Sequence, residues 1–357
     1  MKYSTAIGID THGKTNTICV LDPDTGAMIE TTLSGDPGDV AEWINKQRFP
    51  LPIMAAYESG PTGFVLARVL VAAGIPCKIA AVSKLAKNPN EKKNDKEDAR
   101  KLARRIVSGE IYAVWIPSPE QEAGCNLSRL RGEAATDLRR AKQRATSFLL
   151  KMGIRYTDGK RWTQKFRKWA KALEFEKELD TYVFREKLAD VYAQEQRLVS
   201  IEQRLHEFID VDLELKALVA RLMCIHGIGF VIASALVLEV GDFTRFKNGQ
   251  SLASYLGLVP TENSSGEKDV KGKITKAGNG HLRRLMVEGA SAYSRRSRLD
   301  VPSDPTVDSL VRIHAHKGSK RLYKRRNALA KRKKQHNKAK VAIAREMAEW
   351  VYYIATM

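Results

Sequence analysis

The 357-residue chain lacks paired cysteines and long apolar runs. Its four cysteines, Cys19, Cys77, Cys125 and Cys224, lie far apart without any CxxC pair, which argues against a zinc ribbon or a disulfide scaffold. No run of 18 apolar residues is present, so no membrane-spanning helix is expected. The first residues also lack the apolar stretch of a secretory signal. We therefore expect a reduced, cytoplasmic protein that has no membrane partner.

Acidic residues are missing from residues 311–345, which contain 14 Lys and Arg. The whole chain has 61 basic and 41 acidic residues, a net charge of +20, whereas residues 1–80 carry six basic and eight acidic residues. Concentrated positive charge predicts a polyanionic partner, most often nucleic acid, with an anionic membrane as the lesser alternative. Because 43% of the residues are apolar, the chain can also bury substantial cores and is not a disordered polycation.

The first 118 residues alternate short apolar segments with turn residues. The segment Asp22-Pro23-Asp24-Thr25-Gly26 has strong turn chemistry, because proline restricts φ and glycine accepts a positive φ. The expected elements are, in order, three strands (6–9, 17–21 and 27–33), a helix (38–48), a strand (52–57), a helix that begins near Pro61 and a strand (77–82). This order predicts an α/β ribonuclease-H-like fold, which RuvC-type nucleases and sugar kinases share.

The rest of the chain predicts mainly helix. Residues 122–221 are charged and poor in strand signals, and apolar residues at spacings of three and four across 182–221 favour long helices in a coiled-coil or helical arm. Beyond residue 222 we expect helices at 230–240, 251–258 and 280–293, two helices after residue 319, and a polar loop at 261–280. The predicted domains are a RuvC-like domain (1–118), a helical arm (119–218) and a mainly α-helical C-terminal domain (219–357).

Four acidic residues are candidates for a metal site. Asp10 ends the first strand and Glu58 the fourth, and these strand ends are neighbours in the predicted fold. Asp95 and Asp98 lie three apart in a helix expected over 94–107, so one helix face presents both. Converging carboxylates need cations, and two Mg²⁺ ions are the natural partner in nucleases. Taken singly, Asp95 and Asp98 could simply favour the dipole at the start of their helix, and Glu58 could cap the helix that follows it.

Two glycine-bearing segments have competing interpretations. Residues 7–15 resemble the first phosphate motif of sugar kinases, but His12 stands where that motif has glycine, and no second phosphate loop follows. A sugar-kinase-like enzyme is therefore a weaker alternative. Residues 225–229, Ile-His-Gly-Ile-Gly, open a helix as in a helix-hairpin-helix, whose backbone N–H groups bind phosphate. An ordinary turn between helices explains the same segment equally well.

Basic residues follow a serine-containing loop. On composition alone, Ser264-Ser265-Gly266 is a plain loop, but a serine that attacks a phosphodiester needs charge stabilisation, which Lys276, Arg283 and Arg284 could supply. Residues 322–334 keep Leu322, Tyr323, Leu329 and Ala330 among the cations, which favours a helix docked on one side and facing phosphate on the other, although such runs are often only a solvated face. The tail residues expected to bind nucleic acid are Lys320, Arg321, Lys324, Arg325, Arg326, Lys331, Arg332, Lys333 and Lys334.

Several motifs together resemble one family, the DEDD-type insertion-sequence transposases. The matching segments are Gly8-Ile9-Asp10, Tyr57-Glu58-Ser59-Gly60, Asp95-Lys96-Glu97-Asp98-Ala99-Arg100, Gly257-Leu258-Val259-Pro260, Ser264-Ser265-Gly266, Ile274-Thr275-Lys276-Ala277-Gly278-Asn279 and the closing segment 338–346. The likeness covers nearly the whole chain. It implies a RuvC-like domain, a coiled coil and a C-terminal transposase domain with a nucleophilic serine.

The resemblance also implies a mechanism and partners. Asp10, Glu58, Asp95 and Asp98 would hold Mg²⁺, and Ser265, or the adjacent Ser264, would attack the DNA backbone to form a covalent phosphoserine link. Half-sites from different subunits would meet, so a homo-oligomer (dimer or tetramer) is expected. A structured non-coding RNA encoded beside the gene, the bridge RNA, would guide the choice of donor and target DNA.

The predicted function is therefore RNA-guided DNA recombination by an insertion-sequence transposase. The alternative within the same chemistry is a RuvC-type, Mg²⁺-dependent endonuclease that uses activated water and no covalent step. A non-catalytic nucleic-acid-binding scaffold is the alternative from a different class.

Overall fold

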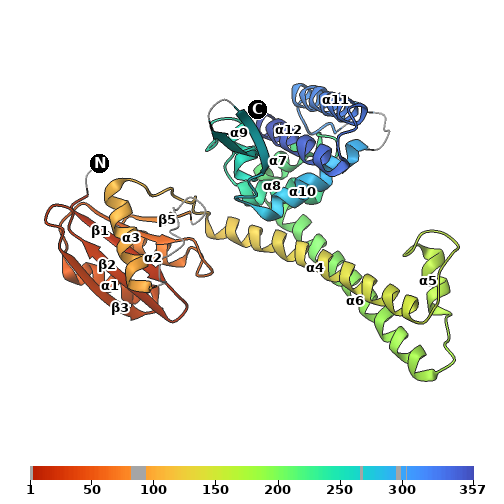
Figure 1. Ribbon diagram of the computed structural model, residues 1–357, viewed down its shortest axis with the longest axis horizontal. Helices are drawn as coiled ribbons and strands as arrows, with labels where there is room; N and C mark the ends of the chain where they lie inside the picture. Colours follow the sequence, from red (N-terminus) through yellow and green to blue (C-terminus); the bar gives the residue numbers. More distant parts are fainter. Residues whose placement is uncertain (1–2, 82–93, 266–267, 295–298, 303) are drawn as a thin grey trace. The chain divides into compact units, whose positions relative to one another are not determined.

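The computed structural model divides the chain into two compact units, Met1–Pro117 and Ser118–Met357 (Figure 1). It describes residues 3–81, 94–265, 268–294, 299–302 and 304–357, with the backbone alone for 262–265 and 268–271. Among these residues no helix is both long enough and apolar enough to cross a membrane.

The first unit is built around a five-stranded mixed sheet. Its strands are β1 (Thr5–Thr11), β2 (Thr15–Leu21), β3 (Met28–Ser34), β4 (Ile53–Glu58) and β5 (Cys77–Ala80), in the order β3-β2-β1-β4-β5. Strand β2 pairs antiparallel with β1 and β3, whereas β4 pairs parallel with β1 and β5. This topology agrees with the predicted ribonuclease-H-like fold.

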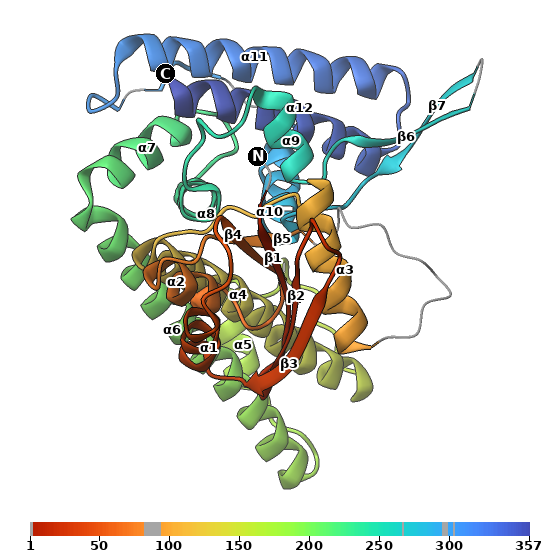
Figure 2. The ribbon, with the colours of Figure 1, turned by 90° about the vertical axis from the view of Figure 1, so that its left-hand side faces the viewer.

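Helices cover both faces of this sheet (Figure 2). One face packs against α1 (Pro37–Gln47) and α2 (Val65–Ala72), and the other against α3 (Asp95–Ser108). The alternation along β1 assigns the faces, because Ile7 and Ile9 belong to the α1–α2 core while Ala6 belongs to the α3 core. Gly8 and Asp10 therefore lie on the α3 face.

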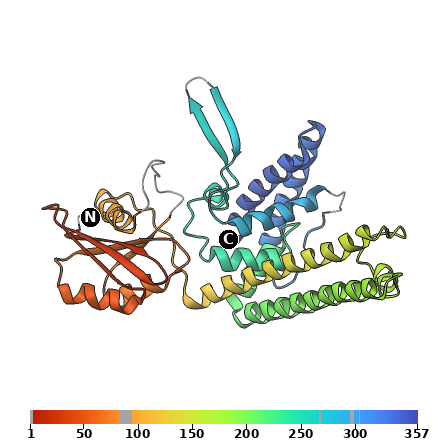
Figure 3. The ribbon, with the colours of Figure 1, turned by 60° about the horizontal axis from the view of Figure 1, so that its bottom comes forward.

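Long helices begin the second unit. Helices α4 (Pro119–Lys151) and α6 (Glu178–Val211) pack side by side, and α5 (Gln164–Lys171) lies at their far end (Figures 1 and 3). Helices are found across 182–221, with a break at Asp212, whose carboxylate caps α7 (Leu213–Met223) by accepting from the Glu214 and Leu215 N–H groups. Helical structure is confirmed here, while a coiled-coil arm and its boundaries stay predictions.

The remaining helices surround one apolar core. They are α8 (Phe230–Val240), α9 (Gly249–Tyr255), α10 (Gly280–Ala290), α11 (Ser309–Lys331) and α12 (His336–Thr356). The apolar side of α12 contributes Ile343, Met347 and Val351 to this core. The end of the basic tail is thus a core helix as well as a charged surface, because its apolar residues recur at helical spacing.

One prediction is wrong in this unit. Residues 261–280 do not form a loop throughout, because β6 (Pro260–Ser265) and β7 (Lys268–Ile274) pair as an antiparallel two-stranded sheet. The segment contains few apolar residues, so it lacks the alternation by which a half-buried strand is recognised. Backbone pairing defines this β6–β7 hairpin.

Candidate active site

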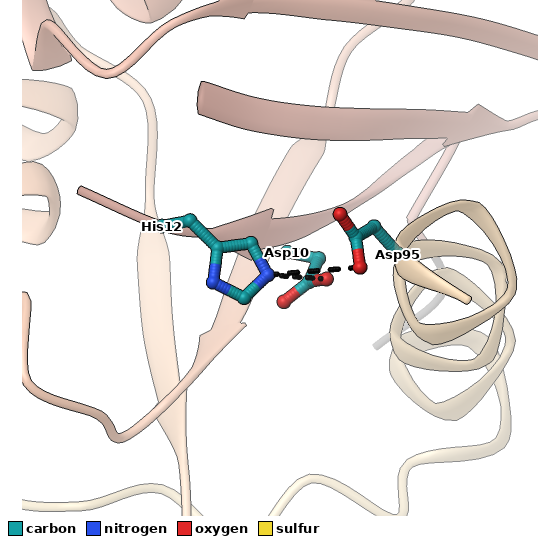
Figure 4. Close-up of side chains that lie close together, drawn as sticks. All are labelled: Asp10, His12 and Asp95. Atoms are coloured by element: carbon teal, nitrogen blue, oxygen red, sulfur yellow. Dashed lines mark hydrogen bonds and ion pairs between the residues drawn. The ribbon is translucent and has the colours of Figure 1, made fainter. Parts of the chain in front are cut away.

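Asp10, His12 and Asp95 come together at one end of the sheet (Figure 4). His12 Nε2 lies 3.2 Å from Asp10 Oδ2 and 3.7 Å from Asp95 Oδ1. One side-chain ligand atom from each of the three residues lies within 4.8 Å of the others. The Asp10 side chain is 19% exposed, whereas those of His12 and Asp95 are about half exposed. The site is therefore open to solvent and has one carboxylate set deeper than the other.

A close approach of α3 to β1 produces this geometry. A Cβ built on Gly8 would lie 2.0 Å from the Ala99 carbonyl oxygen and 2.6 Å from the Ala103 nitrogen. Only glycine permits such contact between a strand and a helix backbone. Asn94 caps α3 by accepting from the Lys96 N–H at 3.2 Å. The first turn of α3, which contains Asp95, is therefore held against the end of β1.

Glu58 and Asp98 stand near this group without joining it. The parallel register pairs Ile9 with Tyr57, so Glu58 follows on β4 beside Asp10, and alternation puts it on the α3 face. The Asp98 carboxylate accepts a hydrogen bond from Lys101 Nζ at 3.2 Å. Within the described part of the chain, the three-residue group does not include either acid. Their role as metal ligands stays a prediction.

The surroundings of Asp10 suit a cation. Burial raises the pKa of the Asp10 carboxyl; His12 opposes this shift, and the charges of Asp95 and Asp98 add to it. A cation at this position would favour the ionised carboxylate that burial and these neighbouring acids disfavour. Two carboxylates and an imidazole are ligands for divalent metals, with oxygen donors preferred by Mg²⁺ and imidazole by transition metals. The donor set fits a divalent ion held by Asp10, Asp95 and His12.

His12 is the member of this group that the sequence analysis did not identify. The residue stood out only as a departure from a kinase phosphate motif. A usable signal was its spacing, because residues i and i+2 of a strand lie on the same face. His12 follows Asp10 at that spacing, and its N–H donates to the Thr15 carbonyl at 2.9 Å in the turn to β2.

The predicted serine lies at the far end of the β6–β7 hairpin. Ser264 pairs with Asp269 and Ser265 with Lys268 across the strands, while both serine side chains lie outside the described residues. The base of the hairpin is held by the Thr275 and Lys276 N–H groups, which donate to the Val259 and Gly257 carbonyls at 2.9 and 3.2 Å. The two serines are thus displayed on a projecting element.

A buried polar cluster lies beneath the hairpin base and has no counterpart in the sequence predictions. The Glu239 side chain on α8 is 1% exposed. Its carboxylate accepts from Asn279 Nδ2 at 2.7 Å and from Ser128 Oγ at 3.4 Å, and it hydrogen-bonds His281 Nδ1. Desolvation raises the Glu239 pKa, but the bonds from His281 and Asn279 outweigh it and the pKa is lowered. The carboxylate therefore joins α4, α8 and α10.

Glu239→Gln tests this cluster. The amide would present donors where the carboxylate accepts from Asn279 and Ser128, so we expect a loss of about 1–3 kcal/mol in the free energy of unfolding. Chemical denaturation measures it. The matched control is Glu207→Gln, which disrupts an exposed pair with Arg204 and should cost at most about 1 kcal/mol. Equal stability of the two variants would contradict the structural role of Glu239.

The predicted nucleic-acid-binding residues divide into paired and exposed groups. Arg321 Nε and Arg325 Nε lie 2.7 and 2.9 Å from the carboxylate of the buried Glu346, and Arg283 donates to the Leu256 carbonyl at 3.1 Å. These three side chains have partners within the fold, although the Arg321 side chain stays 67% exposed, and Arg326 is half-buried. The exposed members are Lys276, Arg284, Lys320, Lys324, Lys331, Arg332, Lys333 and Lys334.

The turn at 225–229 contacts other helices of its own unit. The His226 N–H donates to Ser319 Oγ at 3.0 Å, and a Cβ on Gly227 would meet the Gly289 carbonyl oxygen at 2.5 Å. Both groups face other helices of the same unit. This arrangement favours a turn between packed helices over a phosphate-binding hairpin.

Comparison with known proteins decides the family. Residues 7–154 match a DEDD transposase family of the IS110 type, and residues 219–302 match the transposase family IS116/IS110/IS902. A transposase-named protein of Sinorhizobium fredii, y4qE, is 34% identical over 303 residues, which cover 84% of this chain and 74% of the relative. The chain belongs to the IS110-type DEDD transposase family.

A second relative extends the match to nearly the full length. The transposase for insertion sequence element IS1533 of Leptospira borgpetersenii is 29% identical over 94% of this chain and 99% of its own length. The transposase for insertion sequence element IS1328 of Yersinia enterocolitica is 27% identical over 69% of this chain and 72% of its own. As a DEDD transposase, the protein is an enzyme that binds DNA and uses a divalent metal.

Proposed function

We propose that this transposase is an RNA-guided DNA recombinase of an insertion sequence that works through a phosphoserine intermediate. The observation that carries the proposal is the meeting of Asp10 and Asp95 in one unit, together with a serine pair displayed on a hairpin in the other. Family membership supports transposition, and the motif likeness at 257–279 supports the serine step. The proposed partners are donor and target DNA, a structured bridge RNA, and further copies of the chain.

The residues of this chain have distinct parts in the proposed reaction. Asp10, Glu58, Asp95 and Asp98 would hold Mg²⁺, which would supply charge stabilisation for the reacting phosphate. The Ser265 hydroxyl loses its proton and attacks phosphorus; an O–P bond forms, and the bond from phosphorus to a deoxyribose oxygen breaks, with that oxygen taking up a proton. Attack by another strand end reverses the step and frees the serine. Exposed cations such as Lys276 and Arg284 hold the DNA backbone.

Ser265→Ala is the decisive test of the nucleophile. Because the covalent bond requires the hydroxyl, we expect covalent protein–DNA adducts to fall by at least about 1,000-fold. Denaturing gels with labelled cognate DNA, Mg²⁺ and the transcript of the flanking non-coding DNA measure them. The matched control is Ser264→Ala, which should keep its adducts. Equal adducts from wild type and Ser265→Ala would exclude Ser265, and adducts formed equally without the transcript would exclude RNA guidance.

A RuvC-type endonuclease is the second candidate. The grouping of Asp10, His12 and Asp95 within the Met1–Pro117 unit favours it, because such a centre can activate water without the serine. In that case DNA would be cut in the presence of Mg²⁺ while no adduct forms with any variant.

A further inference from the structure

The far end of the helical arm is strongly basic, whereas the rest of the arm is not. Residues 151–171, hereafter the arm tip, contain eight Lys or Arg and one acid, Asp158, for a net charge of +7. The two helical segments behind it, 119–150 and 178–211, together contain ten basic and twelve acidic residues, a net charge of −2. The excess of positive charge on this arm is therefore largest at its tip, because 119–150 carries only +2, 178–211 carries −4, and residues 172–177 add one lysine and two acids.

Many charged residues of segments 119–150 and 178–211, hereafter the shaft, form ion pairs with one another. Arg131 pairs with Glu202 and Arg144 with Asp190 across α4 and α6, at 2.5 and 2.7 Å, and further pairs join Arg197 to Asp137 and Lys142 to Glu195. At the tip, Arg167 pairs with Glu195 and Lys165 with Asp158. Among the described residues, no ion pair involves the exposed tip cations Lys151, Arg155, Lys160, Arg161 and Lys168.

An aromatic cluster holds the tip in a defined shape. Phe166 is buried. The centroid of its ring lies 5.1 Å from the ring centroids of Tyr156 and Trp162 and 5.5 Å from that of Trp169. Thr163 caps α5 by accepting from the Phe166 N–H at 3.3 Å. The tip is thus a folded cap at the end of α4 and α6, rather than a loose basic loop.

This packing directs the cations outward. Phe166 and Ala170 bury one side of α5, so at 100° per residue Lys168 lies on the opposite side, with Lys165 and Lys171 flanking it. The Trp169 ring is partly exposed beside them. Lys165, Lys168 and Lys171 thus share one side of α5, and such a row of cations matches the repeated charges of a nucleic-acid backbone.

We propose that the arm tip is a separate DNA-binding surface, which contacts the phosphate backbone of duplex DNA without reading its sequence. DNA is the partner because the family acts on DNA, and the clustered cations of the tip suit the phosphate contacts that position a protein on a duplex without reading its bases. The surface is remote from the hairpin and basic tail helices: α4 rises about 25 Å between Gly132, which contacts His281, and Leu149. It contacts DNA outside the segment bound by those elements.

The test compares salt dependence between two matched variants of the full-length protein. The tip variant is Lys160→Gln, Arg161→Gln, Lys165→Gln and Lys168→Gln, and the shaft control is Arg139→Gln, Arg140→Gln, Arg144→Gln and Arg204→Gln. Both lose four exposed cations. Fluorescence anisotropy on a duplex of arbitrary sequence gives the slope of log affinity against log salt, to which each phosphate contact contributes about 0.9.

We expect the magnitude of this slope to decrease by two or more in the tip variant and by less than one in the shaft control. The two-substitution variant Lys165→Gln and Lys168→Gln should fall about half as far, and circular dichroism checks that all three remain helical. Equal slopes for tip and shaft variants would overturn the proposal, and so would an effect on structured RNA that is absent on DNA. The assay needs neither Ser265 nor a guide RNA, so its outcome is independent of the proposed recombination mechanism.

Discussion

Asp10→Asn is expected to lower metal-dependent DNA cleavage by at least about 100-fold. The carboxylate is the most buried member of the Asp10–His12–Asp95 group, and a catalytic metal contributes several kcal/mol, with each 1.4 kcal/mol worth a factor of ten in rate. Strand cleavage as a function of Mg²⁺ or Mn²⁺ concentration measures the loss. Asp95→Asn should also lower DNA cleavage, because the Asp95 carboxylate lies beside the same His12 imidazole.

A stability measurement separates loss of metal from loss of fold. Burial raises the Asp10 pKa, so above the ordinary carboxyl pKa the ionised group opposes folding. Without metal at neutral pH, Asp10→Asn should therefore unfold at the same temperature as wild type or higher. Added metal should raise the wild-type unfolding temperature and leave that of the variant unchanged. Glu42→Gln, an exposed change on α1, is the matched control and should keep both responses.

Gly8→Ala is expected to destabilise the first unit by about 1–3 kcal/mol or more. The added methyl group would lie 2.0 Å from the Ala99 carbonyl oxygen, so α3 must move, and overpacking of a fitted interface typically costs 1–3 kcal/mol or occasionally more. Chemical denaturation measures the loss. Movement of α3 also displaces Asp95, so metal binding should weaken in the fraction that remains folded.

Gly13→Ala is the matched control for this substitution. A Cβ at Gly13 would meet nothing within 4 Å, and the residue lies in the turn between β1 and β2. Its stability should stay within about 0.5 kcal/mol of wild type. If Gly8→Ala were as stable as Gly13→Ala, the close packing of α3 on β1 would be wrong.

Much of the first unit was predictable because its signals are local. Apolar segments bounded by turn residues predicted the five strands and their order. The helix expected over 94–107 is found as α3 at Asp95–Ser108. In the second unit, the apolar run from Phe230 to Val240 was predicted to the residue. Turn residues, capping residues or apolar periodicity within a few positions are enough to indicate each of these elements.

The features that were missed depend on contacts between distant segments. The β6–β7 hairpin forms by backbone pairing of polar residues and has no apolar pattern to reveal it. Glu239 looks like one acid in an apolar helix, and only the packing of α4 and α10 supplies its partners from positions 128, 279 and 281. The basic run predicts that Arg321 and Arg325 bind phosphate, but in the structure both pair with Glu346.

The sequence by itself determined which chemical groups this transposase has: an ordered set of acids near its beginning and positive charge concentrated in its tail. Tertiary structure alone decided which of these groups meet. It brought His12 and Asp95 to Asp10 and held Glu346 against part of the tail. It also left the arm-tip cations facing solvent. The physical reason is that composition and spacing specify the charge of a side chain, whereas its partner depends on how distant elements pack.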